Sequence, residues 1–219
     1  MNLSEFILND IKPLHLANKI SDVQMMFNQL TFSHIPILNE DNVYVGCASE
    51  ADVHCFDSAK ELADYSYAIE GFFVREDAVW LNVLEAFANN STNIMPVLSK
   101  NNIYLGYYEL NDIIGLFNET PFFAENGGIL IVEKGYNDYS FSEVSQIVES
   151  NNGKLLGVFI SKIENDLIQL TLKVSGIDLN EIIQGFRRYS YNIISGHDDD
   201  AFIETLKERS DYLKKYLDI

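Results

Sequence analysis

The fold of this chain is decided by two stretches of sequence that align without a gap: SHIPILNEDNVYVGCASEAD (33–52) and NIMPVLSKNNIYLGYYELND (93–112). The identical positions share one offset of 96 − 36 = 60 residues and include Pro36 and Pro96, Gly46 and Gly106, and Asp52 and Asp112. A constant offset of this kind indicates an internal structural repeat.

Within each copy the hydrophobic pattern changes from helical to extended and back to helical. Apolar residues at helical spacing follow Ser21 in the first copy and Leu81 in the second. Short apolar runs interrupted by Pro36 and Pro96 then predict two strands joined by a polar turn. Second helices are expected from residue 50 to about 56 and from 110 to about 117. We therefore predict two βαββα units, which need one another to complete a core.

Composition limits the classes of partner. Of the 219 residues, 33 are acidic and 15 are basic, which gives a formal net charge of −18. Such a chain lacks the basic surface that binds nucleic acid or anionic lipid, and no apolar run is long enough to span a bilayer. The first ten residues do not have the pattern of a secretory signal, so a soluble, cytoplasmic protein is expected. Cys47 and Cys55 are predicted to be two small buried hydrophobic residues.

The repeats resemble the CBS-domain family, whose tandem copies form a Bateman-type module. The resemblance is carried by the strands His34–Ile37 and Ile94–Val97 and by the motif Gly-x-x-Ser/Thr-x-x-Asp, which is present as Gly46 to Asp52. The second copy has Glu109 where the motif has Ser or Thr. The resemblance implies CBS repeats at residues 1–60 and 61–120.

The pattern after the repeats predicts a separate domain. A linker is expected at residues 121–128, followed by a βαββαβ order at 129–196 and an amphipathic helix at 197–219. This order is ferredoxin-like, and beside a CBS pair it resembles an ACT-like domain, as in acetoin-utilisation-type regulatory proteins. The loop at 135–140 lacks the Pro-Gly pair of amino-acid-binding ACT domains. The overall prediction is an α/β (α+β) protein.

The CBS resemblance implies a ligand-binding cleft. Asp52 and Asp112 would accept hydrogen bonds from ribose hydroxyls, Ser49 would bind phosphate, and His34 would approach phosphate, with Asn93 at its position in the second repeat. The residues that would flank an adenine ring are Ile35, Ile37, Met95 and Val97, and the adjacent Pro36 and Pro96 are further candidate ligand-binding residues.

Each assignment has a structural alternative. Ser49 and Asp52 also fit a helix-capping arrangement, a histidine near a proline in a strand is often structural, and the apolar residues belong at least partly to the core. His197 to Asp200 are interpreted as the start of the last helix rather than as metal ligands. No catalytic or metal motif is recognised, so we expect neither an enzyme nor a resident cofactor.

Three functions remain open at this point. The first is a regulatory sensor, a homodimer that binds AMP, ADP, ATP or S-adenosylmethionine and acts on an unidentified protein partner. The second is a structural oligomerisation module with a degenerate, ligand-free cleft. The third is a small hydrolase of an unrecognised type. Met25, Met26, Ile113, Ile114 and Phe117 are the apolar residues expected to contribute to self-association.

Overall fold

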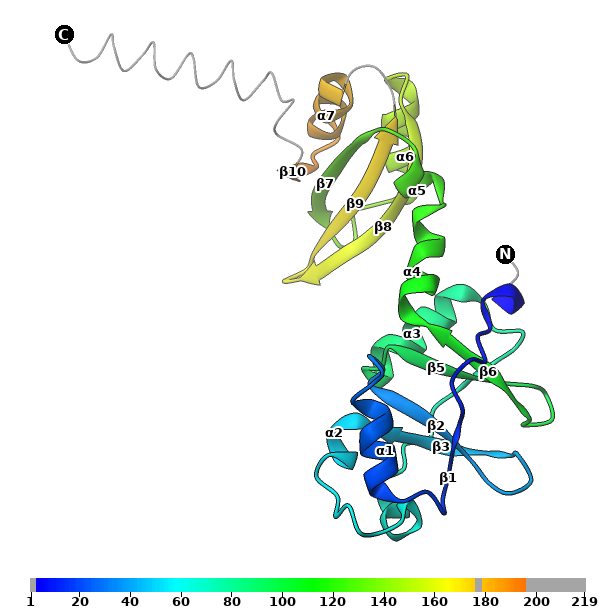
Figure 1. Cartoon of the computed structure of the whole chain (residues 1–219). Coiled ribbons are helices and arrows are strands. Elements are labelled where there is room, and N and C mark those ends of the chain that lie inside the picture. Colours follow the sequence, from blue (N-terminus) through cyan, green and yellow to red (C-terminus); the bar gives the residue numbers. More distant parts are fainter. Residues whose placement is uncertain (1–2, 176–178, 196–219) are drawn as a thin grey trace. The chain divides into compact units, whose positions relative to one another are not determined.

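The computed structural model describes residues 3–175 and 179–195 and divides into two units, Met1–Phe117 and Asn118–Ile219 (Figure 1). Both units combine helices with a β-sheet, which confirms the expected α/β class.

The first repeat has the predicted βαββα order. Its elements are β1 (Leu14–His15), α1 (Ile20–Phe27), β2 (His34–Leu38), β3 (Tyr44–Ser49) and α2 (Glu50–Val53). They form a sheet in the order β1-β2-β3, in which β1 is parallel and β3 antiparallel to β2. The lead-in to β1 contains a short 3-10 helix, η1 (Leu3–Phe6).

The second repeat reproduces the first with the same register. Its elements are β4 (Val74–Arg75), α3 (Trp80–Asn90), β5 (Ile94–Leu98), β6 (Tyr104–Glu109) and α4 (Leu110–Asn118), preceded by the 3-10 helix η2 (Leu62–Ala68). The sheet order is β4-β5-β6. Ile37 pairs with Gly46 just as Val97 pairs with Gly106, so the offset of 60 residues in sequence is also an offset in structure.

Two asparagines explain why the hairpin turns are alike. Asn42 and Asn102 have positive φ angles of 58° and 63°, a left-handed conformation that asparagine adopts more readily than most residues. In the first turn the Asn39 carboxamide oxygen accepts hydrogen bonds from the N–H groups of Asp41 and Val43 at 3.0 and 2.8 Å. Ser99 Oγ accepts the equivalent pair of bonds in the second turn.

Each repeat has a lead-in segment before its first strand, residues 3–13 in the first repeat and 69–73 in the second. The two repeats exchange these lead-in segments. The N–H and C=O groups of Leu8 bond those of Tyr107 in β6, at 2.9 and 2.8 Å, so the start of the first repeat lies on the second. Glu70, which leads into the second repeat, bonds Cys47 in β3 in the same way, at 2.8 and 3.0 Å. Each repeat therefore supplies an extra strand-like edge to the other.

The exchange also mixes the hydrophobic cores. The core cluster built around α1 and β2 includes Ile94 and Tyr107 of the second repeat. The cluster built around α3 and β5 includes Leu3 and Cys47 of the first. All of these side chains are at most 4% exposed. Each cluster is thus completed by residues of the other repeat, as expected for βαββα units that need one another.

The second unit is a ferredoxin-like domain. Its elements are α5 (Pro121–Ala124), β7 (Gly128–Gly135), α6 (Phe141–Ser150), β8 (Lys154–Glu164), β9 (Leu167–Ser175), α7 (Leu179–Arg188) and β10 (Asn192–Ser195). The sheet is antiparallel in the order β10-β7-β9-β8. This is the 4-1-3-2 arrangement of the βαββαβ fold, which confirms the predicted topology.

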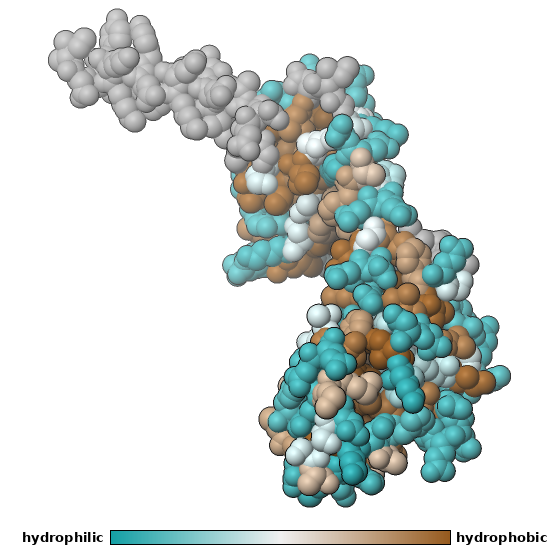
Figure 2. Space-filling view, viewed as in Figure 1, coloured by the Kyte–Doolittle hydropathy of each residue, from teal (hydrophilic) through white to brown (hydrophobic). Residues whose placement is uncertain are grey.

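The sheet of the second unit is packed unequally on its two faces. Helices α6 and α7 bury alternate residues of β7 and β9 in one cluster. On the other face Phe122 of α5 lies 6.0 Å from Phe159 of β8, ring centre to ring centre. Ile129 and Phe159 remain 51% and 47% exposed there, and Figure 2 shows apolar side chains among polar ones over this unit.

Several local predictions need correction. The helix expected to reach about residue 56 ends at Val53, and the expected linker at 121–128 contains α5 and the first residue of β7. Cys55 is exposed, whereas Cys47 is buried as expected, and both thiols are free. The helix expected at 197–219 and the interpretation of His197 to Asp200 lie outside the described residues.

Substitution of Gly106 tests whether the exchange of lead-in segments stabilises the fold. A Cβ atom at this position would overlap the Leu8 carbonyl oxygen and would lie 2.7 Å from Ile7 Cγ2, whereas one at Gly115 meets nothing within 4 Å. Gly106→Ala should lower the free energy of unfolding by about 2 kcal/mol or more. Gly115→Ala, the control, should leave it unchanged or raise it by up to about 1 kcal/mol. Equal stabilities in urea unfolding would show that the contact is dispensable.

Candidate functional site

The residues predicted to bind a ligand gather at the start of β2 and the end of β3. His34 and Ser49 are register partners, and Asp52 lies in α2 directly after them. The equivalent pair in the second repeat is Ile94 with Glu109, followed by Asp112 in α4. Ile94, not Asn93, is therefore the counterpart of His34, and the expected equivalence of Asn93 is wrong by one residue.

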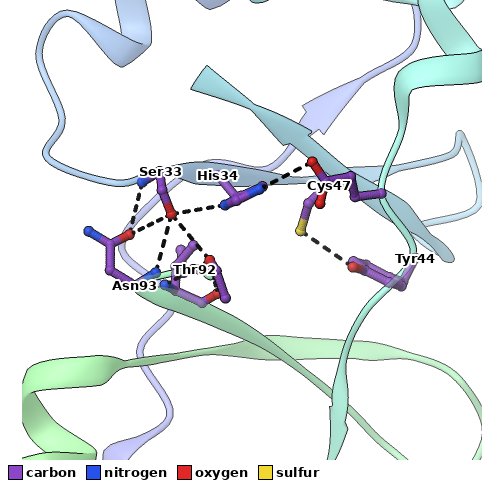
Figure 3. Close-up of polar contacts among 8 residues, drawn as sticks. Ser33, His34, Tyr44, Cys47, Thr92 and Asn93 are labelled. Atoms are coloured by element: carbon purple, nitrogen blue, oxygen red, sulfur yellow. Dashed lines mark hydrogen bonds and ion pairs between the residues drawn. The ribbon is translucent and has the colours of Figure 1, made fainter. Parts of the chain in front are cut away.

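Asn93 instead joins the two repeats through Ser33 (Figure 3). Its side-chain oxygen accepts hydrogen bonds from Ser33 N–H at 2.8 Å and from Ser33 Oγ at 3.0 Å, and its Nδ2 donates to the Thr31 carbonyl at 2.8 Å. Ser33 Oγ also lies 3.2 Å from the hydroxyl of Thr92. This network fixes the distance between β2 and β5, the two central strands.

His34 is attached to the same network and is 6% exposed. Its Nδ1 lies 2.9 Å from Ser33 Oγ, and its Nε2 lies 3.5 Å from a carboxylate oxygen of Glu70. The imidazole also meets the ring of Phe72 edge to face, with 5.2 Å between the ring centres. Its partners come from both repeats, so His34 holds the lead-in segment of the second repeat against the first.

Ser49 and Asp52 are less constrained. Ser49 is the residue before α2, yet its hydroxyl makes no capping hydrogen bond, and Asp52 is exposed. Within residues 3–175 and 179–195, neither side chain takes part in a hydrogen bond or ion pair. The capping alternative suggested by the sequence is therefore not realised for Ser49.

The apolar residues expected to flank an adenine ring lie in the core. Ile35, Ile37, Met95 and Val97 are completely buried, and Pro36 and Pro96 beside them are buried as well. Ile35 packs with the cluster around α1, and Met95 packs with the cluster around α3. An adenine ring in contact with them would require their neighbours to move.

The second repeat places negative charge where the first has Ser49. Glu109 is half-buried, and burial followed by the nearby carboxylates of Asp112 and Asp10 raises its pKa above the ordinary value. Asp10 belongs to the lead-in segment of the first repeat and accepts a 2.5 Å hydrogen bond from the hydroxyl of Tyr107. The module thus has two equivalent halves, one formed by His34, Ser49 and Asp52 and the other by Ile94, Glu109 and Asp112. These halves differ in charge.

Sequence reasoning missed three residues of this region: Asp10, Ser33 and Glu70. Asp10 and Glu70 reach the site from lead-in segments that pair with the opposite repeat, and no local motif marks them. The repeat offset could have identified Ser33, because Ser33 and Asn93 occupy equivalent positions 60 residues apart and form a hydrogen bond with each other.

Cys47 does not supply a reactive thiol. Burial raises the pKa of the Cys47 thiol to about 12, and its Sγ lies 3.4 Å from the hydroxyl of Tyr44 (Figure 3). A thiol nucleophile must be deprotonated near neutral pH. Nor do the described residues contain a group of three or more His, Cys, Asp or Glu side chains able to hold a metal ion. In the same residue ranges no helix is long and apolar enough to cross a bilayer.

Several solved structures are similar to this chain at low sequence identity. No family model and no curated protein matches the sequence. A CBS domain pair/ACT domain protein from Thermotoga maritima is similar over 54% of this chain and 98% of its own, at 15% identity and a TM-score of 0.49. CBSX2 in complex with AMP is 11% identical over 53% and 95% of the two chains, with a TM-score of 0.46.

The cytosolic domain of the Mg²⁺ channel MgtE in complex with ATP is also similar, at 15% identity and a TM-score of 0.45, over 51% of this chain and 46% of its own. The paired βαββα architecture is established by the strand order and register of the chain itself.

The raised pKa of Glu109 predicts how the stability of the protein depends on pH. This raised pKa means that the folded state holds the proton more tightly than the unfolded state, so ionisation costs stability above that pKa and the cost disappears as pH falls through it. Glu109→Gln should therefore raise the melting temperature by a few degrees at pH 7 and leave it nearly unchanged at about pH 4.

Glu85→Gln is the control, because this exposed helix residue carries the same charge in the same unit. A Glu109→Gln gain that matches the Glu85→Gln gain, or that does not depend on pH, would contradict the electrostatic account.

Proposed function

We propose that the chain is a non-enzymatic regulatory protein whose first unit binds an adenosine-containing ligand at the half formed by His34, Ser49 and Asp52. The observation that carries the proposal is the state of Ser49 and Asp52. A hydroxyl and a carboxylate stand beside the junction of the two repeats, and neither is engaged by another side chain in the described ranges. A carboxylate can accept both hydroxyl groups of a ribose through charge-assisted hydrogen bonds.

Ligand binding at this half is expected to change the contact between the two repeats. Glu70 bonds β3 through its main chain and faces His34 through its side chain. A ligand that contacts Ser49 and Asp52 lies next to this junction and favours whichever arrangement of the lead-in segment fits it better. The response is then a change in the strength of the contacts between the repeats. A protein partner or the ferredoxin-like unit would respond to this change.

The half around Glu109 is expected to reject phosphate. Asp10, Glu109 and Asp112 place carboxylates where a nucleotide phosphate would approach. Two unit charges about 4 Å apart repel by roughly 4 kcal/mol at an effective dielectric constant near 20. We therefore expect one nucleotide per chain rather than two, with AMP, ADP, ATP and S-adenosylmethionine as the ligands to test first.

A structural module without a ligand is the second candidate, and two observations favour it. Ile35 and Met95 are completely buried, and both imidazole nitrogens of His34 face partners in the protein. Such a module would act through self-association. Of the residues expected at a homodimer interface, Met25 and Ile114 are 60% and 45% exposed, but Ile113 is buried in the core.

Titration calorimetry with adenosine, AMP and ATP tests the ligand proposal. Asp52→Ala should weaken the tightest of these ligands by about 10- to 150-fold, because hydrogen bonds to a charged group contribute about 1.5–3 kcal/mol. Asp41→Ala is the control, since it removes the same charge at the other end of the sheet. Equal affinities for both variants would refute the ribose assignment, and no binding by the parent chain would favour the structural module.

A further inference from the structure

A cavity of about 730 Å³ lies at the other end of the first sheet from His34. It opens where the parallel strands β1 and β2 end, and the side chains that define it are His15, Leu16, Leu38, Asn39, Glu40 and Glu61. Crevices at the carboxyl ends of parallel strands are common ligand sites. The cavity is independent of the half proposed above to bind adenosine.

Its wall is built by two segments that brace one another. The connection between β1 and α1 and the segment that enters η2 share main-chain hydrogen bonds: Ile20 N–H to the Lys60 carbonyl, Leu62 N–H to the Asn18 carbonyl and Ala63 N–H to the Leu16 carbonyl, at 2.9, 2.9 and 2.8 Å. Leu62 is 1% exposed and anchors the second segment in the core. The cavity is therefore preformed, which lowers the ordering cost of binding.

The second repeat carries a cationic side chain at the corresponding strand ends. At the offset of 60, Arg75 is the counterpart of His15, and Lys100 is the counterpart of Glu40. Arg75 Nη1 donates to the Ser99 carbonyl at 2.6 Å, and Lys100 Nζ lies 3.5 Å from Asp77. A guanidinium on an aliphatic stem thus closes the strand ends of the second repeat.

The first repeat retains the carbonyl acceptor without the cation. The carbonyl of Asn39, counterpart of Ser99, accepts a hydrogen bond from Asn42 N–H at 3.1 Å, just as Ser99 accepts from Asn102 at the same distance. A carbonyl oxygen has a second lone pair, which Arg75 occupies in the second repeat. Among the described residues no second donor reaches Asn39, and the carboxylates of Glu40 and Glu61 add negative charge beside it.

We infer that this cavity binds a small organic cation, a guanidinium carried on a short aliphatic stem. The guanidinium donates to the Asn39 carbonyl and to the carboxylates of Glu40 and Glu61. The stem lies against Leu16 and Leu38, the apolar part of the lining. The ligand supplies to the first repeat the group that Arg75 supplies to the second.

The probe for this site is n-butylguanidine, with pentanoate as an anion of similar size and n-pentanol as an uncharged comparison. Amide chemical shifts in a ¹⁵N-labelled chain should move at residues 15–17, 38–40 and 61–63 with a dissociation constant on the order of 1 mM. Neither comparison compound should produce this pattern. The shifts at residues 34, 49 and 52 should stay constant, which separates this site from the adenosine half.

The decisive variant is His15→Arg, which copies Arg75 and should fill the site from within. It should abolish n-butylguanidine binding while the chain stays folded, and Glu61→Gln should weaken binding by roughly three- to tenfold. His54→Arg is the matched control, because His54 is exposed and lies outside the cavity. Undiminished binding in His15→Arg, equal binding of pentanoate, or no binding by the parent chain would each overturn the inference.

Discussion

The first unit depends on one interaction, the exchange of lead-in segments between its two repeats. Leu8 bonds Tyr107 and Glu70 bonds Cys47 through the main chain, each pair across the boundary between repeats. Gly106 and Gly46 permit the approach, because a side chain at either position would overlap the incoming segment. The first of these segments carries Leu3 into the core cluster around α3 and β5, and the second packs Ile69 against the cluster around α1 and β2.

The same exchange makes the two halves unequal. The segment that carries Glu70 brings a carboxylate to His34, whereas the segment that carries Asp10 adds a third acidic group near Glu109 and Asp112. At the other end of the sheets the asymmetry recurs, with Arg75 closing one repeat and a cavity left in the other. A duplicated fold has thus been given different chemistry at equivalent places.

Much of the fold follows from the sequence, because the constant offset between identical residues and the periodicity of apolar residues can both be recognised without knowledge of tertiary contacts. The ferredoxin-like order was likewise predictable from alternating strands and amphipathic helices. The site was predictable only in part. Asp10 and Glu70 act through strand pairing across the repeats, which no local pattern encodes, and Asn93 was placed one residue out of register. Burial of Ile35 and Met95 depends on packing from both sides of a sheet.

Hydrogen exchange of individual amides is the most direct test of the exchanged segments. The amides of Leu8, Tyr107, Cys47 and Glu70 all form the crossing hydrogen bonds. If these bonds hold the repeats as one cooperative unit, the four amides should exchange with one common free energy of opening, equal to that of the central strands β2 and β5. Much faster exchange at Leu8 and Tyr107 than at Cys47 and Glu70 would contradict the account, because the repeats would then open separately.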